Sequence, residues 1–261
     1  MVSFEKAVRE DIPSLKELWL CCFEEKPQAA ELFFERTIDY VHAYKATVGT
    51  RIIAAVYCVD CRLNGKRAHY LCGVSTHPDF RKQGVMRKLM RFALADAEQR
   101  GDAYSVLFPS NAGLYRFYEQ FGYVSRCRVT QTVLKHEELG VYSEMDPDYP
   151  DTDELQRVCR QNNFLFWNKD FIRFTMDYYA VYGVKTLFSS DALAIAEVEN
   201  GTASVLYAVY RDLDSLKTLL SALKAERYIL TSAGGDLPFG MIAPLGHNRL
   251  PDNTFIGVTL N

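Results

Sequence analysis

Apolar and polar positions in the first half of the chain follow an ordered series of strands and helices. Alternation over residues 2–8 predicts a strand, and Asp11, followed by Ile12 and Pro13, is expected to cap the helix that comes next. In that helix, apolar residues recur at helical spacing: Leu15, Leu18, Trp19 and Cys22. The rest of this half predicts, in order, a helix over 29–40, strands over 44–48, 51–58 and 67–76, a long amphipathic helix over 84–99, a strand over 104–108, a helix over 112–121 and a closing strand of this unit over 123–135.

Residues 137–152 interrupt this pattern. They contain Pro147, Pro150 and several acidic residues without an apolar period, which favours a linker. Beyond it the pattern predicts a helix over 153–162, an aromatic run over 164–167, strands over 186–197 and 203–210, a helix over 213–225, a strand over 227–231, a segment over 239–245 and a strand over 254–260. We therefore expect domains over 1–136 and 153–261, each of mixed α and β structure.

Composition narrows the class of protein. The 261 residues are 48% hydrophobic and 24% charged, which is typical of a globular chain, and the formal net charge of −3 argues against nucleic acid as a partner. The sequence shows no secretory signal and no apolar run of about 18 residues, so we expect a cytoplasmic protein that is not in a membrane. The pair Cys58 and Cys61 has no second ligand pair at zinc spacing, so we interpret both as strand-packing residues and expect no metal.

The segment from Val74 to Met90 carries the first candidate chemistry. It is a strand, a short loop containing Gly84, and then a helix, an order that directs unpaired backbone N–H groups and the positive end of the helix dipole toward one point. A pyrophosphate suits such a point, since Arg81, Lys82 and Arg87 add positive charge around it.

The run Arg81-Lys82-Gln83-Gly84-Val85-Met86 resembles the Q/R-x-x-G-x-G/A phosphate-binding motif of the GNAT acetyltransferases. Met86 takes the place of the small residue in the pattern. The chain also resembles enzymes of the enhanced-intracellular-survival (Eis-like) branch, which tolerate a bulky residue at this position. The resemblance implies an α+β GNAT fold, with a mixed central sheet flanked by helices and a second, degenerate GNAT-like unit. It also implies that acetyl-CoA is the acyl donor.

A second match to the family begins at Asn111. The stretch Asn111 to Tyr123 resembles the pattern N-x-x-A-x-x-x-Y-x-x-x-G-F/Y, with Leu114 in place of the small residue. The resemblance implies that Asn111 lies at the pantetheine arm and that Tyr118 protonates the leaving thiolate. A tyrosine taken alone is more often a packing residue, but a phenol with a pKa of about 10 can protonate a thiolate.

The family's third feature is a strand that splays from its neighbour at a bulge, and residues 72–76 occupy that place. By resemblance, the N–H of Val74 would stabilise the oxyanion, which makes Val74 a catalytic candidate beside Tyr118. The expected cofactor-binding residues are Val74, Ser75, Thr76, Arg81, Lys82, Gln83, Gly84, Val85, Met86, Arg87 and Asn111.

The sequence thus predicts an acetyl-CoA-dependent N-acetyltransferase that acts on a primary amine by direct attack in a ternary complex. The alternative is a non-catalytic acyl-CoA-binding or regulatory protein. Glu24, Glu25 and, by its chemistry, His77 are candidate bases near the acceptor, which is a small-molecule or protein amine. The second half has no glycine at its strand-to-helix junction near Arg211, so we expect a single CoA site per chain, and a homo-oligomer stays open.

Overall fold

The computed structural model describes residues 1–140, 149–159 and 164–260. Contacts divide the chain into unit 1, which consists of Met1–Arg126 and Gly240–Asp252, and unit 2, which consists of Cys127–Phe239 and Asn253–Asn261. Residues 141–148 of the expected linker and 160–162 of the expected helix lie outside the described residues. No helix in the described part of the chain is long and apolar enough to cross a membrane.

Unit 1 is built on a mixed sheet with helices on both faces. Its elements are β1 (Val2–Lys6), α1 (Ile12–Cys22), α2 (Pro27–Arg36), β2 (Val41–Val48), β3 (Arg51–Leu63), β4 (Lys66–Thr76), α3 (Val85–Gln99), β5 (Tyr104–Leu107), α4 (Ala112–Glu119) and β12 (Leu237–Pro244). Short 3-10 turns lie at Arg9–Asp11 and Pro78–Phe80.

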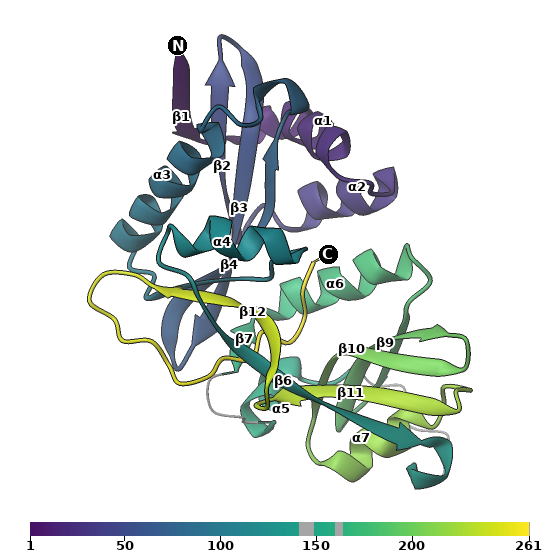
Figure 1. Cartoon of the computed structure of the whole chain (residues 1–261). Helices are drawn as coiled ribbons and strands as arrows, with labels where there is room; N and C mark the ends of the chain where they lie inside the picture. Colours follow the sequence, from purple (N-terminus) through teal and green to yellow (C-terminus); the bar gives the residue numbers. More distant parts are fainter. Residues whose placement is uncertain (141–148, 160–163, 261) are drawn as a thin grey trace. The chain divides into compact units, whose positions relative to one another are not determined.

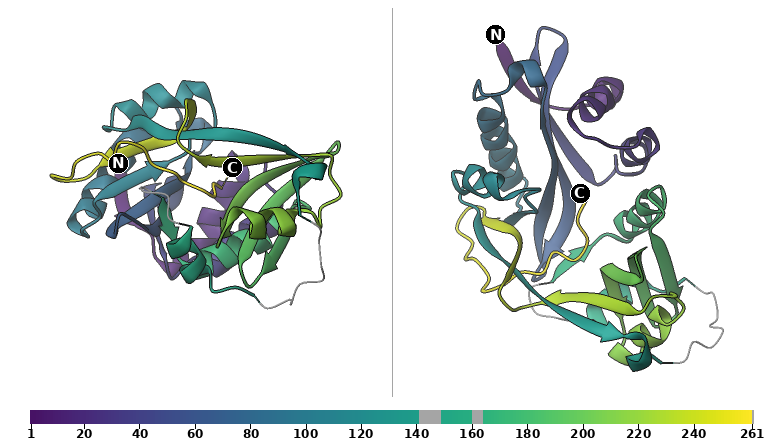
Figure 2. Two further views of the ribbon diagram at one scale, coloured as in Figure 1. Left: turned by 90° about the horizontal axis from the view of Figure 1, so that it is seen from below. Right: turned by 45° about the vertical axis from the view of Figure 1, so that its right-hand side comes forward.

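Strands β1 to β4 pair antiparallel in sequence order, and β5 joins β4 in parallel after the crossover through α3. Figures 1 and 2 both show helices α1 and α2 on one face of this sheet and α3 on the other. The core on the α3 face contains Leu89, Met90 and Ala93 of that helix against Val56 and Leu71 of the sheet. The prediction of an α+β fold with a mixed sheet is confirmed.

The CxxC cysteines are explained by strand geometry. Cys58 pairs with Leu71 and Cys61 pairs with Ala68 in a regular stretch of β3 and β4, so the two thiols face opposite sides of the sheet. Both are free and buried. Their role as strand-packing residues is confirmed.

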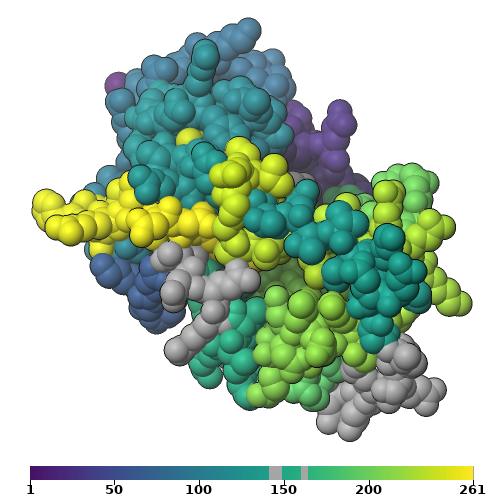
Figure 3. Space-filling model, turned by 60° about the horizontal axis from the view of Figure 1, so that its bottom comes forward, coloured from purple at the N-terminus to yellow at the C-terminus, as the bar shows by residue number. Residues whose placement is uncertain are grey.

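The sheet of unit 1 is completed by a segment from the end of the chain. In β12, residues Met241–Pro244 pair antiparallel with Tyr104–Leu107 of β5, and Met241 and Ala243 are buried in the same core as α3. Leu245 N–H donates to the carbonyl of Ala103, and the yellow segment lies against the blue and teal atoms of this unit in Figure 3. The sequence pattern had assigned residues 239–245 to the second half.

Unit 2 holds the remaining elements. They are β6 (Val124–Lys135, which begins at the end of unit 1), a 3-10 turn (His136–Glu138), α5 (Thr152–Val158), β7 (Leu165–Trp167), α6 (Lys169–Ala180), β8 (Lys185–Ser189), β9 (Ala192–Glu199), β10 (Thr202–Tyr210), α7 (Leu213–Leu220) and β11 (Arg227–Ala233). Within this unit β6 pairs antiparallel with β11, from Val129 opposite Ala233 to Lys135 opposite Arg227. The domain limits expected from the sequence remain a prediction.

The order of elements in unit 2 repeats that of unit 1. Strands β8, β9 and β10 are antiparallel neighbours, α7 crosses over, and β11 returns parallel to β10. Strand β10 carries an extra residue, Leu206, at a register shift, and its pairs with β11 end at Val205. This is the same arrangement as β4, α3 and β5, so the prediction of a second GNAT-like unit is confirmed.

Three details of unit 2 differ from the predicted pattern. Helix α6 was not predicted, although Asn168 caps it by accepting from the N–H of Asp170. The strand expected over 186–197 is two strands, β8 and β9, with a turn at Ser190 and Asp191. Residues 254–260 form no strand, and only Phe255 makes an isolated bridge, to Phe164.

A buried ionic cluster fixes the end of α3 to the sheet of unit 1. His69 Nδ1 lies 2.8 Å from Asp102 Oδ2, and Arg100 Nη2 donates to the same oxygen at 2.6 Å. Although burial opposes ionisation, His69 and Arg100 hold the pKa of the Asp102 carboxyl below its ordinary value.

Asp102→Asn should therefore lower stability at neutral pH. A carboxyl whose folded pKa is depressed stabilises the fold above its unfolded pKa of about 3.9. That contribution is lost as pH falls through the folded pKa. Urea denaturation from pH 7 to pH 3 should show a gap between the parent and the variant that narrows toward the acid end; a gap independent of pH would contradict this account.

Candidate functional site

Strand β4 is bulged beside the segment that the sequence singled out. Cys72 pairs with Tyr57 and Ser75 pairs with Ala55, so Gly73 and Val74 together face a single residue of β3. On its other side β4 pairs with β5 only over Ala68–Tyr70, and the described pairs end before the bulge. The two parallel strands therefore diverge at the place where the family resemblance implies a splay.

Gly73 is the residue that makes this bulge possible, and sequence reasoning did not single it out. Its φ is +57°, and a Cβ built there would lie 2.6 Å from Cδ2 of Tyr57 and even closer to the ring of Trp19. The Trp19 and Tyr57 rings in turn contact each other, with centroids 5.3 Å apart. Aromatic packing from α1 and β3 thus shapes the strand that carries Val74.

The loop after β4 ends in the first turn of α3. Gly84 occupies the N-cap of this helix with φ +75°, and an added Cβ would meet no atom within 4 Å. Lys82 also has a positive φ of 61°. The first N–H of the region to bond back within the helix is that of Lys88, which donates to Gly84, so the preceding N–H groups face outward as donors.

A cavity of about 340 Å³ lies at this helix start. It is lined by Thr76, Phe80, Arg81, Lys82, Gly84, Val85, Met86, Arg87 and Phe117. Seven of these residues are candidates named from the sequence for cofactor binding. The positive end of the α3 dipole and the cationic side chains meet at this cavity, as is typical of an anion-binding site.

The polar side chains of the loop are partly engaged in local bonds. Arg81 Nε donates to the carbonyl of Thr76 at 3.0 Å, and Arg87 Nε donates to Gln120 Oε1 at 2.7 Å. Gln83 Nε2 donates to the carbonyl of Asp79, which fixes the loop instead of leaving the amide for a ligand. Both arginine side chains line the cavity, so their positive charges remain at it.

Of the other candidates, Ser75 is buried and its Oγ lies 3.5 Å from the carbonyl of Ala55. Asn111 caps α4, since its side-chain oxygen accepts from Gly113 N–H at 3.1 Å. The bulky residues Met86 and Leu114 at the departures from the family pattern pack partly buried against the α3 core. The departures are therefore accommodated by packing.

Tyr118 lies on α4 and is 6% exposed. Its ring contacts Phe117 and Tyr123, and its hydroxyl has no hydrogen-bond partner among the described residues. Burial raises the pKa of the Tyr118 phenol, with a smaller contribution from the Cys72 thiol, the residue before the bulge. An unpaired, protonated hydroxyl thus lies beside the bulged strand.

The two candidate glutamates differ in position. Glu25 accepts from the indole N–H of Trp19, and its charge is one cause, after burial, of the raised pKa of the Cys72 thiol. Glu24 is exposed. His77 lies between Arg51, whose Nη2 is 2.8 Å from Nε2, and Asp79. Of the three candidate bases, Glu25 is thus the one whose charge acts on Cys72, the residue before the bulge.

Unit 2 differs from unit 1 at the equivalent helix start. Asp212 caps α7, and its carboxylate accepts from the N–H of Ser215 at 2.8 Å. A fixed negative charge thus occupies the position where the first turn of α3 leaves its N–H groups open. This geometry agrees with the expectation that the second half lacks a phosphate loop.

Comparisons with known proteins agree with this fold. A family model described as an acetyltransferase (GNAT) domain matches residues 3–125. A conserved protein of unknown function from Enterococcus faecalis is similar at a TM-score of 0.72 and 16% identity, over 94% of this chain and 73% of that chain. Eis1 from Mycobacterium abscessus is similar at a TM-score of 0.69 and 14% identity, over 94% of this chain and 74% of that chain.

A GCN5-related N-acetyltransferase from Kribbella flavida is similar at a TM-score of 0.67 and 14% identity, over 93% of this chain and 70% of that chain. No curated protein matches the sequence. At these identities the solved structures speak for the fold alone, and that resemblance extends over both units. The family model and the bulged strand, loop and helix agree: the chain carries an acetyltransferase domain of the GNAT family at residues 3–125.

Proposed function

We propose that unit 1 transfers an acetyl group from acetyl-CoA to a primary amine by direct attack in a ternary complex. The observation that carries the proposal is the cavity of about 340 Å³ at the start of α3, which lies directly after the bulged end of β4. Backbone N–H groups with Arg81, Lys82 and Arg87 would hold the donor's pyrophosphate there. The divergence of β4 from β5 would admit its pantetheine arm as an added strand.

The groups proposed to take part in the reaction lie on or close to strand β4. The amine nitrogen attacks the thioester carbonyl carbon, and the N–H of Val74 stabilises the negative oxygen of the tetrahedral intermediate. When the carbon–sulfur bond breaks, the Tyr118 hydroxyl gives its proton to the sulfur. Glu25, half-buried and close to Cys72, would take the proton that the amine must lose. Glu24 is exposed, and its charge would at most attract the amine acceptor as it approaches the site.

The pyrophosphate site can be tested by reversing single charges. Lys82→Glu should weaken CoA binding by about tenfold or more, since one attractive charge becomes repulsive at a helix N-terminus. Arg81→Glu should abolish binding, because it also removes the bond to Thr76 that fixes the end of β4. Calorimetry with CoA measures both, and Lys224→Glu, an exposed position in unit 2, serves as the matched control.

Equal affinities for Lys82→Glu and Lys224→Glu would overturn the assigned site. Catalysis is tested separately by thiol release from acetyl-CoA across a panel of amines. CoA binding without thiol release would favour a non-catalytic acyl-CoA-binding or regulatory protein instead.

A further inference from the structure

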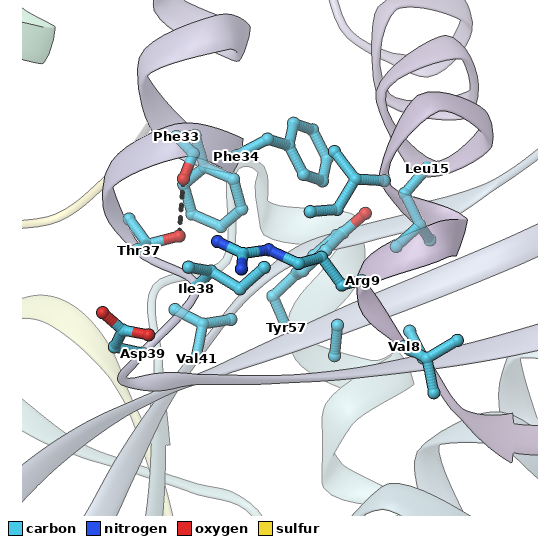
Figure 4. A pocket seen from close by; sticks show the side chains of 13 residues that line it. Val8, Arg9, Leu15, Phe33, Phe34, Thr37, Ile38, Asp39, Val41 and Tyr57 are labelled. Carbon is cyan, nitrogen blue, oxygen red and sulfur yellow. Dashed lines mark hydrogen bonds between the residues drawn. The ribbon is translucent and has the colours of Figure 1, made fainter.

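A second cavity of unit 1 lies between α1, α2 and the first strands of the sheet, and the proposed transfer reaction does not use it. Its volume is about 240 Å³, and its walls come from the β1–α1 connection, both helices, the residues after α2, and β2 and β3 (Figure 4). Pockets for drug-sized ligands run from about 300 to 1,000 Å³. A ligand of this cavity is therefore closer in size to a single amino acid.

The inner wall holds a polar group that the protein leaves unsatisfied. Tyr57 is 1% exposed, and its hydroxyl has no hydrogen-bond partner among the described residues. An unpaired buried hydroxyl costs about 1–3 kcal/mol, so its retention needs a reason. In Figure 4 the Tyr57 side chain lies among the side chains that line the cavity, with its hydroxyl end on the Leu15 side. A ligand atom that pairs with it would remove the cost.

The outer rim holds one positive and one negative side chain without partners. Arg9 and Asp39 are both exposed, and neither makes an ion pair or a side-chain hydrogen bond within the described residues. The guanidinium end of Arg9 extends across the cavity toward Thr37 (Figure 4). The Thr37 hydroxyl is already engaged, since it donates to the carbonyl of Phe33 at 2.6 Å.

This pair of charges selects between ligand classes. A phosphate or other anion would meet Asp39, and a polyamine would meet Arg9, so each would be repelled at one point of the rim. A zwitterion satisfies both, with its carboxylate on Arg9 in the paired geometry that guanidinium favours and its ammonium on Asp39. The rings of Phe33 and Phe34 suit an uncharged side chain between the rim and Tyr57.

We infer that this cavity binds a free, zwitterionic α-amino acid whose side chain carries no charge and ends in a polar atom. The site is distinct from the acyl-transfer site. Trp19, which contacts Tyr57 at 5.3 Å between centroids and packs on Gly73, does not line the cavity. The Tyr57 ring thus lies between this cavity and Gly73 of the bulge in β4.

Calorimetry without any acyl donor tests this inference, so its outcome is independent of the proposed transfer. The probes are L-glutamine, L-asparagine and L-tyrosine, each beside its carboxyl methyl ester. We expect at least one free amino acid to bind and its ester to bind at least tenfold more weakly, because esterification removes the charge that Arg9 pairs. If none binds, or if the esters bind equally, the inference is wrong.

Substitutions of Arg9 and Tyr57 test whether these residues contact the bound amino acid. Arg9→Met should remove the preference for the free acid over its ester, and Arg157→Met, at an exposed arginine of unit 2, should keep it. Tyr57→Phe should weaken binding while leaving the ligand-free protein as stable as the parent or more so, since it deletes an unpaired hydroxyl. A ligand-free Tyr57→Phe protein that unfolds at a lower temperature, or an Arg9→Met protein that matches Arg157→Met, would overturn the assignment.

Discussion

Tyr118→Phe is expected to lower kcat by about 10²–10⁴-fold, the range that a positioned general acid contributes. The substitution removes only a hydroxyl that has no partner among the described residues, and the ring keeps its contacts with Phe117 and Tyr123. Stability and CoA affinity should therefore stay close to those of the parent. Steady-state kinetics with acetyl-CoA and an amine acceptor, together with calorimetry on CoA, measure the two effects separately.

Tyr123→Phe is the matched control for this experiment. Its hydroxyl is bonded to Ser105 Oγ at 2.5 Å, so its loss should cost stability and leave turnover largely unchanged. Because burial raises the pKa of Tyr118, its phenol stays protonated through the neutral range and should cause no loss of activity below about pH 10. Equal losses of turnover in the two variants, or none in Tyr118→Phe, would remove the acid role from Tyr118.

Gly73→Ala is expected to be the most disruptive single change at the site. The new Cβ would sit 2.6 Å from Tyr57 and closer still to Trp19, at a φ of +57° that side chains rarely adopt. The left-handed backbone and the overpacking together should cost about 2–5 kcal/mol of the free energy of unfolding. Any relaxation must move the bulge that carries Val74, so transfer should fall even where the protein remains folded.

Gly49→Ala separates the two causes. Gly49 has a similar φ of +61° in the turn between β2 and β3, but an added Cβ there meets no atom within 4 Å. Urea denaturation of both variants should show a clearly larger loss for Gly73→Ala. If the two losses are equal, the contact of Gly73 with the aromatic rings does not constrain the strand.

Where local chemistry decides the structure, the sequence predicted it well. The apolar period of α3, the loop containing Gly84 and the cations of that loop could be predicted, since each depends on neighbouring residues. Helix α6 was missed because its aromatic residues favour strands by local preference, and burial of Phe171, Phe174 and Tyr178 against the unit's interior decides for a helix. The Asn168 cap was the signal that could have located it.

Features that depend on contacts between residues far apart in the sequence could not be predicted from it. Asp11 precedes α1 as expected, yet its carboxylate accepts from Val8 N–H and pairs with Lys45 at 2.7 Å, so it does not cap the helix. Gly73 is one of several glycines in the sequence, and its importance comes from the close approach of the Trp19 and Tyr57 rings. The pairing of β12 with β5 joins Met241–Pro244 to Tyr104–Leu107, which are far apart in the sequence, and no local pattern encodes it.

That pairing has a consequence for synthesis on the ribosome. Residues 3–125 are translated before β12, so the sheet and core of unit 1 lack Met241 and Ala243 until translation has passed these positions. At about 5–20 residues per second, translation of residues 127–239 holds the nascent domain incomplete for on the order of ten seconds. A chain released before residue 244 would therefore lack the strand that pairs with β5, and we expect the proposed transfer reaction to be limited to chains translated past that point.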